Sequence, residues 1–278
     1  MPWQPEACGI QITPEGDIFT GRAELAFFWG SDSKPLFSRQ RQFLDGYIPV
    51  VSDAWIDGGI RYDYETFGAL LPSDPDNNNT AIFAKMTLRN IGTKTEKARA
   101  ATAFRQNGEN RRERNIRFSK TWKYEIKANQ LWRGTDAQKE CAGTFTAPAC
   151  WEAVSGIPYE IIFGKEYLIT PRTEVAIARY EKELAPGETM ELIIKFPRVP
   201  TADTSYLTEL NAADYAGYRQ KTVDYWKNAL SRFSVIRTPG EPILAESHRA
   251  TATHVMLATR CYNGKKCRLM AYRIPTSF

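Results

Sequence analysis

The sequence predicts a mainly β protein, an antiparallel sandwich followed by helices. Apolar and polar residues alternate along most of the first 200 positions, which is the pattern of half-buried strands, and at least eight such runs follow one another at short spacing. Short spacing leaves no room for crossover helices and therefore favours antiparallel pairing. After Pro197-Arg198-Val199-Pro200 the alternation ends, and apolar residues recur at three- and four-residue spacing, as in a helix.

The first predicted strands cover residues 18–29 and 47–56. Each run places its apolar side chains on one face: Phe19, Ala23, Leu25, Phe27 and Trp29 in the first, and Ile48, Val50, Ala54 and Ile56 in the second. The turn Asp57-Gly58-Gly59 follows, and such residues tolerate the positive φ that a tight hairpin requires. The next strand then alternates Ile60, Tyr62 and Tyr64 with Arg61, Asp63 and Glu65. The two runs are therefore predicted to form a hairpin.

The same alternation predicts further strands up to residue 196. Their apolar faces are Ile82, Ala84, Met86 and Leu88; Ala98, Ala100 and Phe104; Ile116, Phe118, Trp122, Tyr124 and Ile126; and Met190, Leu192, Ile194 and Phe196. Residues 159–168 and 174–184 are additional strand candidates. Asn107-Gly108 is predicted as a tight turn, and Ala185-Pro186-Gly187-Glu188 has Pro and Gly in the central positions of a type II turn.

Residues 204–233 are predicted to be helical, because Val223, Trp226, Leu230 and Phe233 recur at helical spacing. Asn211 followed by Asp214 resembles an N-cap with an acid in the first turn. After a break from Ser234 to Pro242, a second helix is expected from about Ile243 to Arg260, followed by a turn at 263–266. The apolar residues Ile243, Leu244, Val255 and Leu257 of this helix have no large partner in the sequence.

The net charge of +5 is mild for 278 residues and does not require a nucleic-acid partner. The charge is unevenly placed, since residues 105–127 hold eight basic side chains against three acidic ones, an excess equal to that of the whole chain. The solvated face of a hairpin explains this segment, because its polar side chains alternate with apolar ones. An anion-binding patch is the alternative.

The cysteines, Cys8, Cys141, Cys150, Cys261 and Cys267, are odd in number and stand at unrelated spacings. The N-terminus has neither a basic region nor an apolar region of a secretory signal, so we expect reduced thiols and a cytoplasmic location. Cys141 and Cys150 could bridge, but nothing in the sequence requires it. No run approaches ~18 apolar residues, so no membrane partner is expected.

Signatures of the common catalytic and nucleotide-binding sites are missing, including GxGxxG, GxxxxGK[ST], HExxH and GxSxG. His248 and His254 are six positions apart, which is wrong for a metal-binding pair on one helix face. The stretch from Asp74 to Asn79 places oxygens like a calcium loop, but Asn79 stands where Gly is needed and Lys85 where Glu is needed. We therefore expect a polar loop there, with no metal and no cofactor.

Carboxylates are plentiful, but the sequence cannot show which two face each other across a cleft, so no catalytic residue is nominated. Trp55, Trp122 and Trp132 are candidates for stacking on sugar rings. Packing inside the sandwich is the competing interpretation for each of them, because aromatic side chains dominate such cores.

The order of these parts resembles a known family. The run from Gly46 to Gly92, with its strand GYIPVV, its hairpin DGGIRYDYE and the phrase FAKMTLRNIG, is similar to the N-terminal β super-sandwich domain of bacterial six-hairpin (α/α)6-barrel glycoside hydrolases. That family includes glucosidases, glucoamylases and disaccharide phosphorylases. The likeness continues in LAPGETMELIIKFPRVP, residues 184–200, and in DYAGYRQKTVDYWKNAL, residues 214–230. Residues 106–173 match only loosely.

The resemblance implies a super-sandwich domain over 1–202, a linker helix over 203–235, and over 236–278 the truncated start of the (α/α)6 catalytic domain, with the barrel's first helix. It also implies that the catalytic carboxylates lie in the missing barrel in cis, so the chain alone is expected to be inactive. Tyr262, Asn263 and Arg268, which follow the first barrel helix, would be nearest to the substrate, an oligosaccharide or a glucoside.

Two other functions remain open. The first is a stand-alone carbohydrate-binding module, and the second is a β-sandwich interaction protein that uses its basic hairpin as a docking face. The enzyme-fragment hypothesis also predicts that 236–278 is the least well packed part of the chain.

Overall fold

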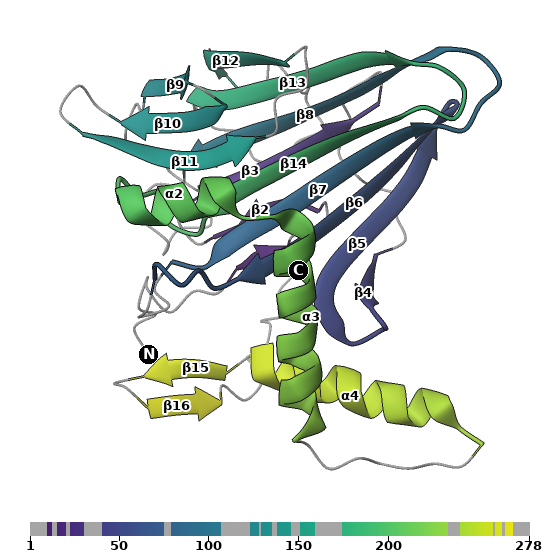
Figure 1. Cartoon of the computed structure of the whole chain (residues 1–278), viewed down its shortest axis with the longest axis vertical. Coiled ribbons are helices and arrows are strands. Elements are labelled where there is room, and N and C mark those ends of the chain that lie inside the picture. Colours follow the sequence, from purple (N-terminus) through teal and green to yellow (C-terminus); the bar gives the residue numbers. More distant parts are fainter. Residues whose placement is uncertain are drawn as a thin grey trace, which may run out of the picture.

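The computed structural model describes residues 10–12, 16–20, 23–30, 41–74, 79–106, 123–127, 129–134, 138–145, 151–158, 174–232, 240–257, 259–262 and 265–268. Within these residues the chain forms two large antiparallel sheets, three helices and one separate hairpin (Figure 1). The predicted fold class, a mainly β sandwich followed by helices, is confirmed.

One sheet has six strands. In spatial order they are β1 (Gln11–Ile12), β2 (Ile18–Phe19), β3 (Ala23–Trp29), β8 (Glu96–Gln106), β13 (Glu174–Leu184) and β12 (Trp151–Pro158). The other sheet has eight strands, in the order β4 (Gln42–Leu44), β5 (Ile48–Asp57), β6 (Ile60–Ala69), β7 (Ala81–Asn90), β14 (Thr189–Pro197), β11 (Lys139–Phe145), β10 (Gln130–Gly134) and β9 (Lys123–Lys127). All neighbouring strands run antiparallel.

The main core lies between the two sheets and contains most of the predicted apolar faces. Its side chains come from both sheets and include, at alternate positions of five strands, Leu25, Phe27 and Trp29; Ile60, Tyr62 and Tyr64; Ile82, Ala84, Met86 and Leu88; Ala98, Ala100 and Phe104; and Met190, Leu192, Ile194 and Phe196. These predictions were correct because alternation with a period of two directly reports which face of a strand is buried.

The first run differs from its prediction because it folds back on itself. Residues 18–29 form not one strand but two, β2 and β3, which pair with each other through Ile18 and Leu25. The connection between them begins at Thr20, whose backbone N–H and side chain both bond the carbonyl of Ala23, at 2.9 and 3.2 Å. A Thr hydroxyl that bonds nearby backbone is a common way to start such a turn.

The predicted face of β5 is only half right. Ile48 and Val50 are buried, but Ala54 is partly accessible and Ile56 is 56% exposed. The other face of β5 joins the main core at its far end, where Trp55 packs. The face that carries Ile56 is covered at its beginning only, because the helices reach no further along the strand.

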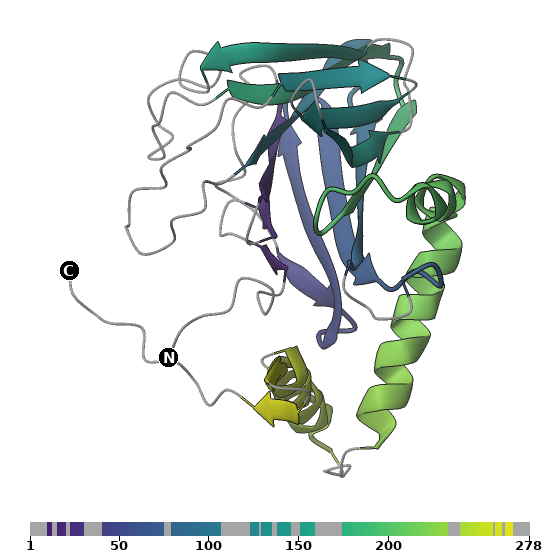
Figure 2. The same cartoon turned by 90° about the vertical axis from the view of Figure 1, so that its left-hand side faces the viewer.

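A second core lies on the outer face of the eight-stranded sheet, beneath α2 (Thr204–Ala212) and α3 (Tyr215–Ser231). It joins Phe67 and Phe83 of the sheet to Leu210, Tyr215 and Tyr218 of the helices. Figure 2 shows α2 and α3 on one side of the strands and α4 (Pro242–Leu257) below them. This second core fixes the direction in which the chain leaves the sandwich.

The predicted helix over 204–233 is divided in two. Ala213 is extended (φ −60°, ψ 118°), and Asp214 caps α3 by accepting a 2.7 Å bond from the N–H of Gly217. Asp203 caps α2 in the same way, while Asn211, which was expected to be a cap, lies inside α2. The carbonyls of Asn211 and Ala213 accept hydrogen bonds from Lys195 Nζ at 2.6 and 3.0 Å, which ties the end of α2 to β14.

The second predicted helix is present as α4, but it ends at Leu257 and not at Arg260. Residues Thr259–Tyr262 instead form β15, which pairs with β16 (Lys265–Arg268). The expected turn at 263–266 is therefore wrong for Lys265 and Lys266, which lie in β16, while Asn263 and Gly264 are outside the described residues. None of the three described helices has the length and apolar character needed to cross a bilayer.

Several predictions fall on residues that the structure does not describe. These are the turn Asn107-Gly108, the strand candidate 159–168 and the apolar positions Ile116, Phe118 and Trp122. Strands β1, β4, β10, β11 and β12 of the described part were not predicted.

The type II turn at 185–188 is confirmed. Gly187 has a φ of +80°, and the N–H of Glu188 bonds the carbonyl of Ala185 at 2.9 Å. A Cβ at Gly187 would meet no atom within 4 Å, so a side chain there would not clash with its neighbours. The cost of a side chain at this position comes only from the positive φ of the backbone. We therefore expect Gly187→Ala to lower the free energy of unfolding by about 1 kcal/mol in urea titrations, and Gly187→Asn by less, because Asn tolerates left-handed φ. Equal losses in the two variants would contradict this explanation.

Candidate functional site

Three of the four residues nominated from the sequence lie in the described part of the chain, on two separate elements. Trp55 lies near the end of β5, whereas Tyr262 and Arg268 lie on the β15–β16 hairpin. In Figure 1, β5 begins near α4 and its far end lies at the upper edge of the sheets, away from this hairpin. On the hairpin, Tyr262 pairs with Lys265 and Arg268 with Thr259, so the two are about 10 Å apart along it. Asn263 lies outside the described residues.

Trp55 is a packing residue of the sandwich. Its ring stacks on Tyr62, with centroids 4.7 Å apart and planes at 17°, and it meets Trp29 edge-on at 4.8 Å. Trp132 likewise packs against the second core, and Trp122 lies outside the described residues. Trp55 and Trp132 therefore each pack against a core while remaining partly accessible.

The loop that resembled a calcium site uses its described oxygens internally. The Asp74 carboxylate accepts a 2.6 Å bond from the N–H of Asn79, and the Asn79 side chain exchanges two 2.8 Å bonds with the backbone of Val199. His254 packs its ring against Phe43, at 5.7 Å. Among the described residues, no three or more His, Cys, Asp or Glu side chains gather as metal ligands would.

The basic segment 105–127 lies mostly outside the described residues. Where its side chains are described, Glu125 pairs with Lys127 and with Lys139 of β11, each at 2.8 Å. These contacts are exposed, and such pairs stabilise a fold only slightly. They fit the solvated face of a sheet.

A polar cluster that the sequence did not reveal joins α3 to the eight-stranded sheet. Glu65 of β6 accepts two hydrogen bonds from Arg219, at 2.7 and 2.9 Å, and one from the Tyr215 hydroxyl at 2.6 Å. Tyr215 and Arg219 stand one turn apart on α3, so both reach the same carboxylate. The sequence shows that Glu65 lies on the face of its strand opposite the core residues, because it alternates with them, but it does not show which side chains meet it there.

This cluster anchors α3 to the sheet, because both oxygens of the Glu65 carboxylate accept hydrogen bonds from that helix. Burial pushes the pKa of Glu65 up, but hydrogen bonds from Arg219 and Tyr215 outweigh burial and hold it below its ordinary value. Burial, together with the charge of Glu65, raises the pKa of Tyr215. A carboxylate held ionised and bonded on both oxygens is a poor general acid.

Beside the cluster of Glu65, Tyr215 and Arg219, a cavity of about 510 Å³ lies over the outer face of β5, β6 and β7. Its charged side chains are paired: Arg61 bonds Asp63 at 2.7 Å, and Lys85 bonds Glu191 at 3.1 Å. Because acids and bases neutralise each other here, the surface has no excess of either sign with which to select a charged substrate.

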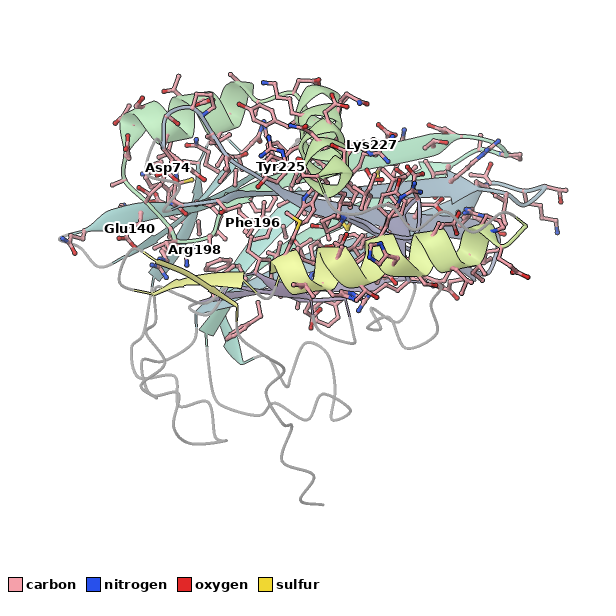
Figure 3. All side chains as sticks on the ribbon, turned by 90° about the horizontal axis from the view of Figure 1, so that it is seen from below. Asp74, Glu140, Phe196, Arg198, Tyr225 and Lys227 are labelled. Carbon is pink, nitrogen blue, oxygen red and sulfur yellow. The ribbon has the colours of Figure 1, made fainter. Side chains whose placement is uncertain are left out.

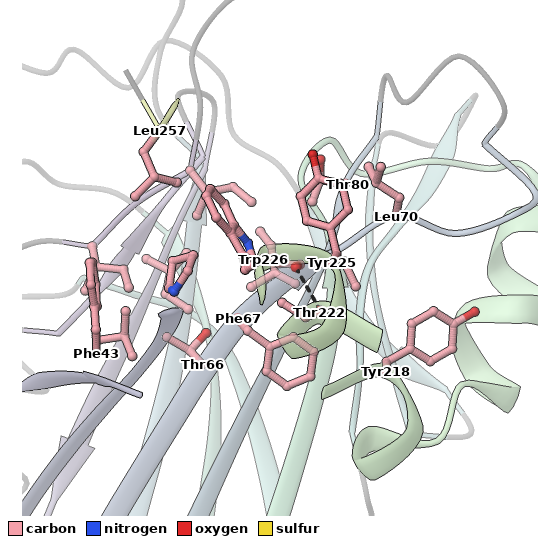
Figure 4. A pocket seen from close by; sticks show the side chains of 18 of the residues that line it. Phe43, Thr66, Phe67, Leu70, Thr80, Tyr218, Thr222, Tyr225, Trp226 and Leu257 are labelled. Atoms are coloured by element: carbon pink, nitrogen blue, oxygen red, sulfur yellow. Dashed lines mark hydrogen bonds between the residues drawn. The ribbon is translucent and has the colours of Figure 1, made fainter. Parts of the chain in front are cut away.

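A larger cavity of about 680 Å³ lies between the β4–β6 edge of the same sheet, α3 and the end of α4 (Figure 4). Phe43 and Leu257 border one side of it, Tyr218 and Tyr225 the other, and Trp226 stands between them. This is the most apolar concave surface among the described cavities. It brings together residues from the beginning, the middle and the end of the chain.

Cys141 is a free, buried thiol on β11. Burial raises its pKa to about 11, and the thiol donates a hydrogen bond to the carbonyl of Gly143 at 3.5 Å. Since the thiolate is the reactive form, we expect the Cys141 peptide to resist iodoacetamide at pH 8 in the folded protein and to react in urea, as measured by peptide mass spectrometry. Equal labelling in both conditions would show that the thiol is accessible.

No known family model matches the chain, and no curated protein matches it. Among solved structures, the chain is similar to one described as a putative kojibiose phosphorylase from the human microbiome, with 11% identity and a TM-score of 0.46. The match covers 84% of this chain and 31% of that chain, so this chain spans less than a third of that protein's length.

Proposed function

We propose that the chain is the N-terminal, non-catalytic part of a carbohydrate-active enzyme that acts on glucosides or related oligosaccharides. In this proposal residues 1–202 form the sandwich, 203–235 link it to the catalytic part, and 236–278 begin an (α/α)6 barrel that carries the catalytic carboxylates. The resemblance of residues 46–92, 184–200 and 214–230 to six-hairpin glycoside hydrolases supports it, as does the order of sandwich, linker helices and further helix.

The observation that carries the proposal is the contrast between α3 and α4. Helix α3 is anchored to the sheet by a paired carboxylate and buried aromatic rings. Helix α4, which follows, exposes Ile243, Leu244, Val255 and Leu257 by 64, 52, 39 and 44%. A rigid connection that presents an apolar helix is what a sandwich needs in order to hold a second domain.

Two measurements test the proposal. The purified chain should release neither glucose nor glucose 1-phosphate from a panel of glucosides and disaccharides, with or without phosphate, because it lacks the catalytic carboxylates. In extracts of the source organism, an antibody against residues 41–106 should detect a protein several hundred residues longer than 278. Turnover by the chain alone, or a native protein of only 278 residues, would contradict the proposal.

If a longer protein is found, Tyr262, Asn263 and Arg268 become the residues to test for contact with substrate. Substitution of each by Ala in the full-length enzyme should then raise KM for the glucoside. Trp55→Ala should instead lower the free energy of unfolding, because Trp55 packs against Trp29 and Tyr62.

A stand-alone carbohydrate-binding module is the second candidate, and one surface feature favours it. Tyr225 is 60% exposed and meets Trp226 edge-on, with centroids 5.8 Å apart. In Figure 3, Tyr225 and Lys227 lie on either side of α3. Aromatic rings at such positions can stack on sugar rings. Affinity gels that contain soluble glucans test this candidate. If the chain migrates more slowly in them and Tyr225→Ala does not, the result favours a binding module over the first candidate.

A further inference from the structure

The 680 Å³ cavity has the size of a ligand site, because ligand pockets usually measure about 300–1,000 Å³. It is bordered by the sheet edge at β4–β6, by the outer turns of α3 and by Leu257 of α4. In Figure 4 the side chains of Phe43, Phe67 and Trp226 form its walls, and Leu257 stands at one end.

The walls of this cavity are mostly carbon. Apolar side chains line it from four directions, among them Ile12, Val51, Phe67, Leu70, Trp226 and Leu257. Two of its hydroxyls are already used, because Thr66 bonds the carbonyl of Phe83 at 2.9 Å and Thr222 bonds that of Gly68 at 3.5 Å. A sugar would bring many hydroxyl groups to a wall with few remaining partners, and leaving them unbonded is costly.

The charged side chains that line the cavity, among the described residues, are Arg41 and Lys221, and both are cationic. Arg41 is held by a 3.0 Å bond to the buried carboxylate of Asp53. Lys221 lies on the surface of α3 with its ammonium 4.4 Å from the centre of the Tyr218 ring. An apolar space bordered by cations complements a molecule with an apolar body and an anionic end.

We propose that this cavity binds an amphipathic anion, namely a medium-chain aliphatic carboxylate. The chain of the ligand lies along Phe67, Trp226 and Leu257, and its carboxylate faces Lys221. Burial of the chain supplies most of the affinity, since each buried CH₂ contributes about 0.8 kcal/mol. The ammonium of Lys221 selects the sign of the head group.

Titration calorimetry with laurate and with dodecyltrimethylammonium, both below their micellar concentrations, tests the proposal. The two probes have equally long chains and opposite charges. We expect one laurate per protein, bound up to about fivefold more tightly than the cationic probe, since one exposed ionic contact is worth up to about 1 kcal/mol. Equal affinities, or no saturable binding of laurate, would overturn it.

Three variants locate the binding site. Leu257→Trp should fill the cavity mouth and weaken laurate by tenfold or more, whereas Leu244→Trp, an equally exposed change on the same helix but away from the cavity, should have no effect. Lys221→Glu should remove the preference for laurate over dodecyltrimethylammonium. Circular dichroism controls for folding. The opposite pattern would overturn the proposal: if Leu244→Trp weakened laurate binding and Leu257→Trp left it unchanged, the ligand would lie on the surface of the helix and not in the cavity.

Discussion

Phe83→Ala should be among the most destabilising single substitutions in this chain and should loosen the docking of α3. Phe83 is fully buried on the outer face of β7. Its ring lies between Phe67, at 5.1 Å with nearly parallel planes, and Tyr218 of α3, at 5.3 Å. Removing such a ring leaves a cavity that the rigid sheet cannot close, and the loss in the free energy of unfolding is expected to be about 3–5 kcal/mol.

Urea denaturation followed by circular dichroism measures this loss. Ile91→Ala is the matched control, because Ile91 follows the same strand directly but is 48% exposed. Its loss should stay below about 1 kcal/mol, as is usual for accessible positions. If Phe83→Ala lost no more than Ile91→Ala, α3 could not be packed on the sheet as the second core requires.

The second core also shows where prediction from the sequence was strong and where it failed. Alternation identified the faces of β6, β7 and β14 because one side of each is buried by the opposite sheet along its whole length. The alternation wrongly predicted that Ile56 is buried. Burial on the outer face of the sheet depends on how far α3 extends over it, and the sequence of β5 carries no information about that. Strands β10 and β11 were not predicted because their burial does not alternate: β10 buries the charged Arg133, and β11 buries five successive residues from Cys141 to Phe145.

The break between α2 and α3 could have been predicted more closely. Asp203 and Asp214 each stand directly before a helix, and an Asp in that position caps the free N–H groups of the first turn. The anchor could not have been predicted, because Glu65 and Arg219 are 154 positions apart and meet only after two sheets and a helix have formed. The same holds for the cavity between α3 and α4.

Glu65→Gln should lower the free energy of unfolding by about 1–3 kcal/mol at pH 7. The substitution keeps the shape of the side chain but removes the charge that Arg219 grips with two hydrogen bonds. Breaking a fully buried pair typically costs about 3–5 kcal/mol, and the effect should be smaller here because the two side chains are 22 and 30% exposed. Glu191→Gln is the control, because Glu191 of β14 pairs with Lys85 of β7 on the same sheet but is 53% exposed, and the expected loss is below about 1 kcal/mol.

The contribution of Glu65 should also depend on pH in a defined direction. Although burial opposes it, bonding by Arg219 and Tyr215 holds the pKa of Glu65 below its ordinary value of 4.5, so the folded state favours the ionised carboxylate. Unfolding therefore takes up a proton at low pH, and the stabilisation is complete above pH 4.5 and declines as pH falls through the lower folded value. Urea titrations at several pH values between 7 and 3 should show wild type and Glu65→Gln converging in acid. A difference that stays constant over this range would mean that the charge of Glu65 does not anchor α3, and that the aromatic contacts of Phe83 alone hold the helix to the sandwich.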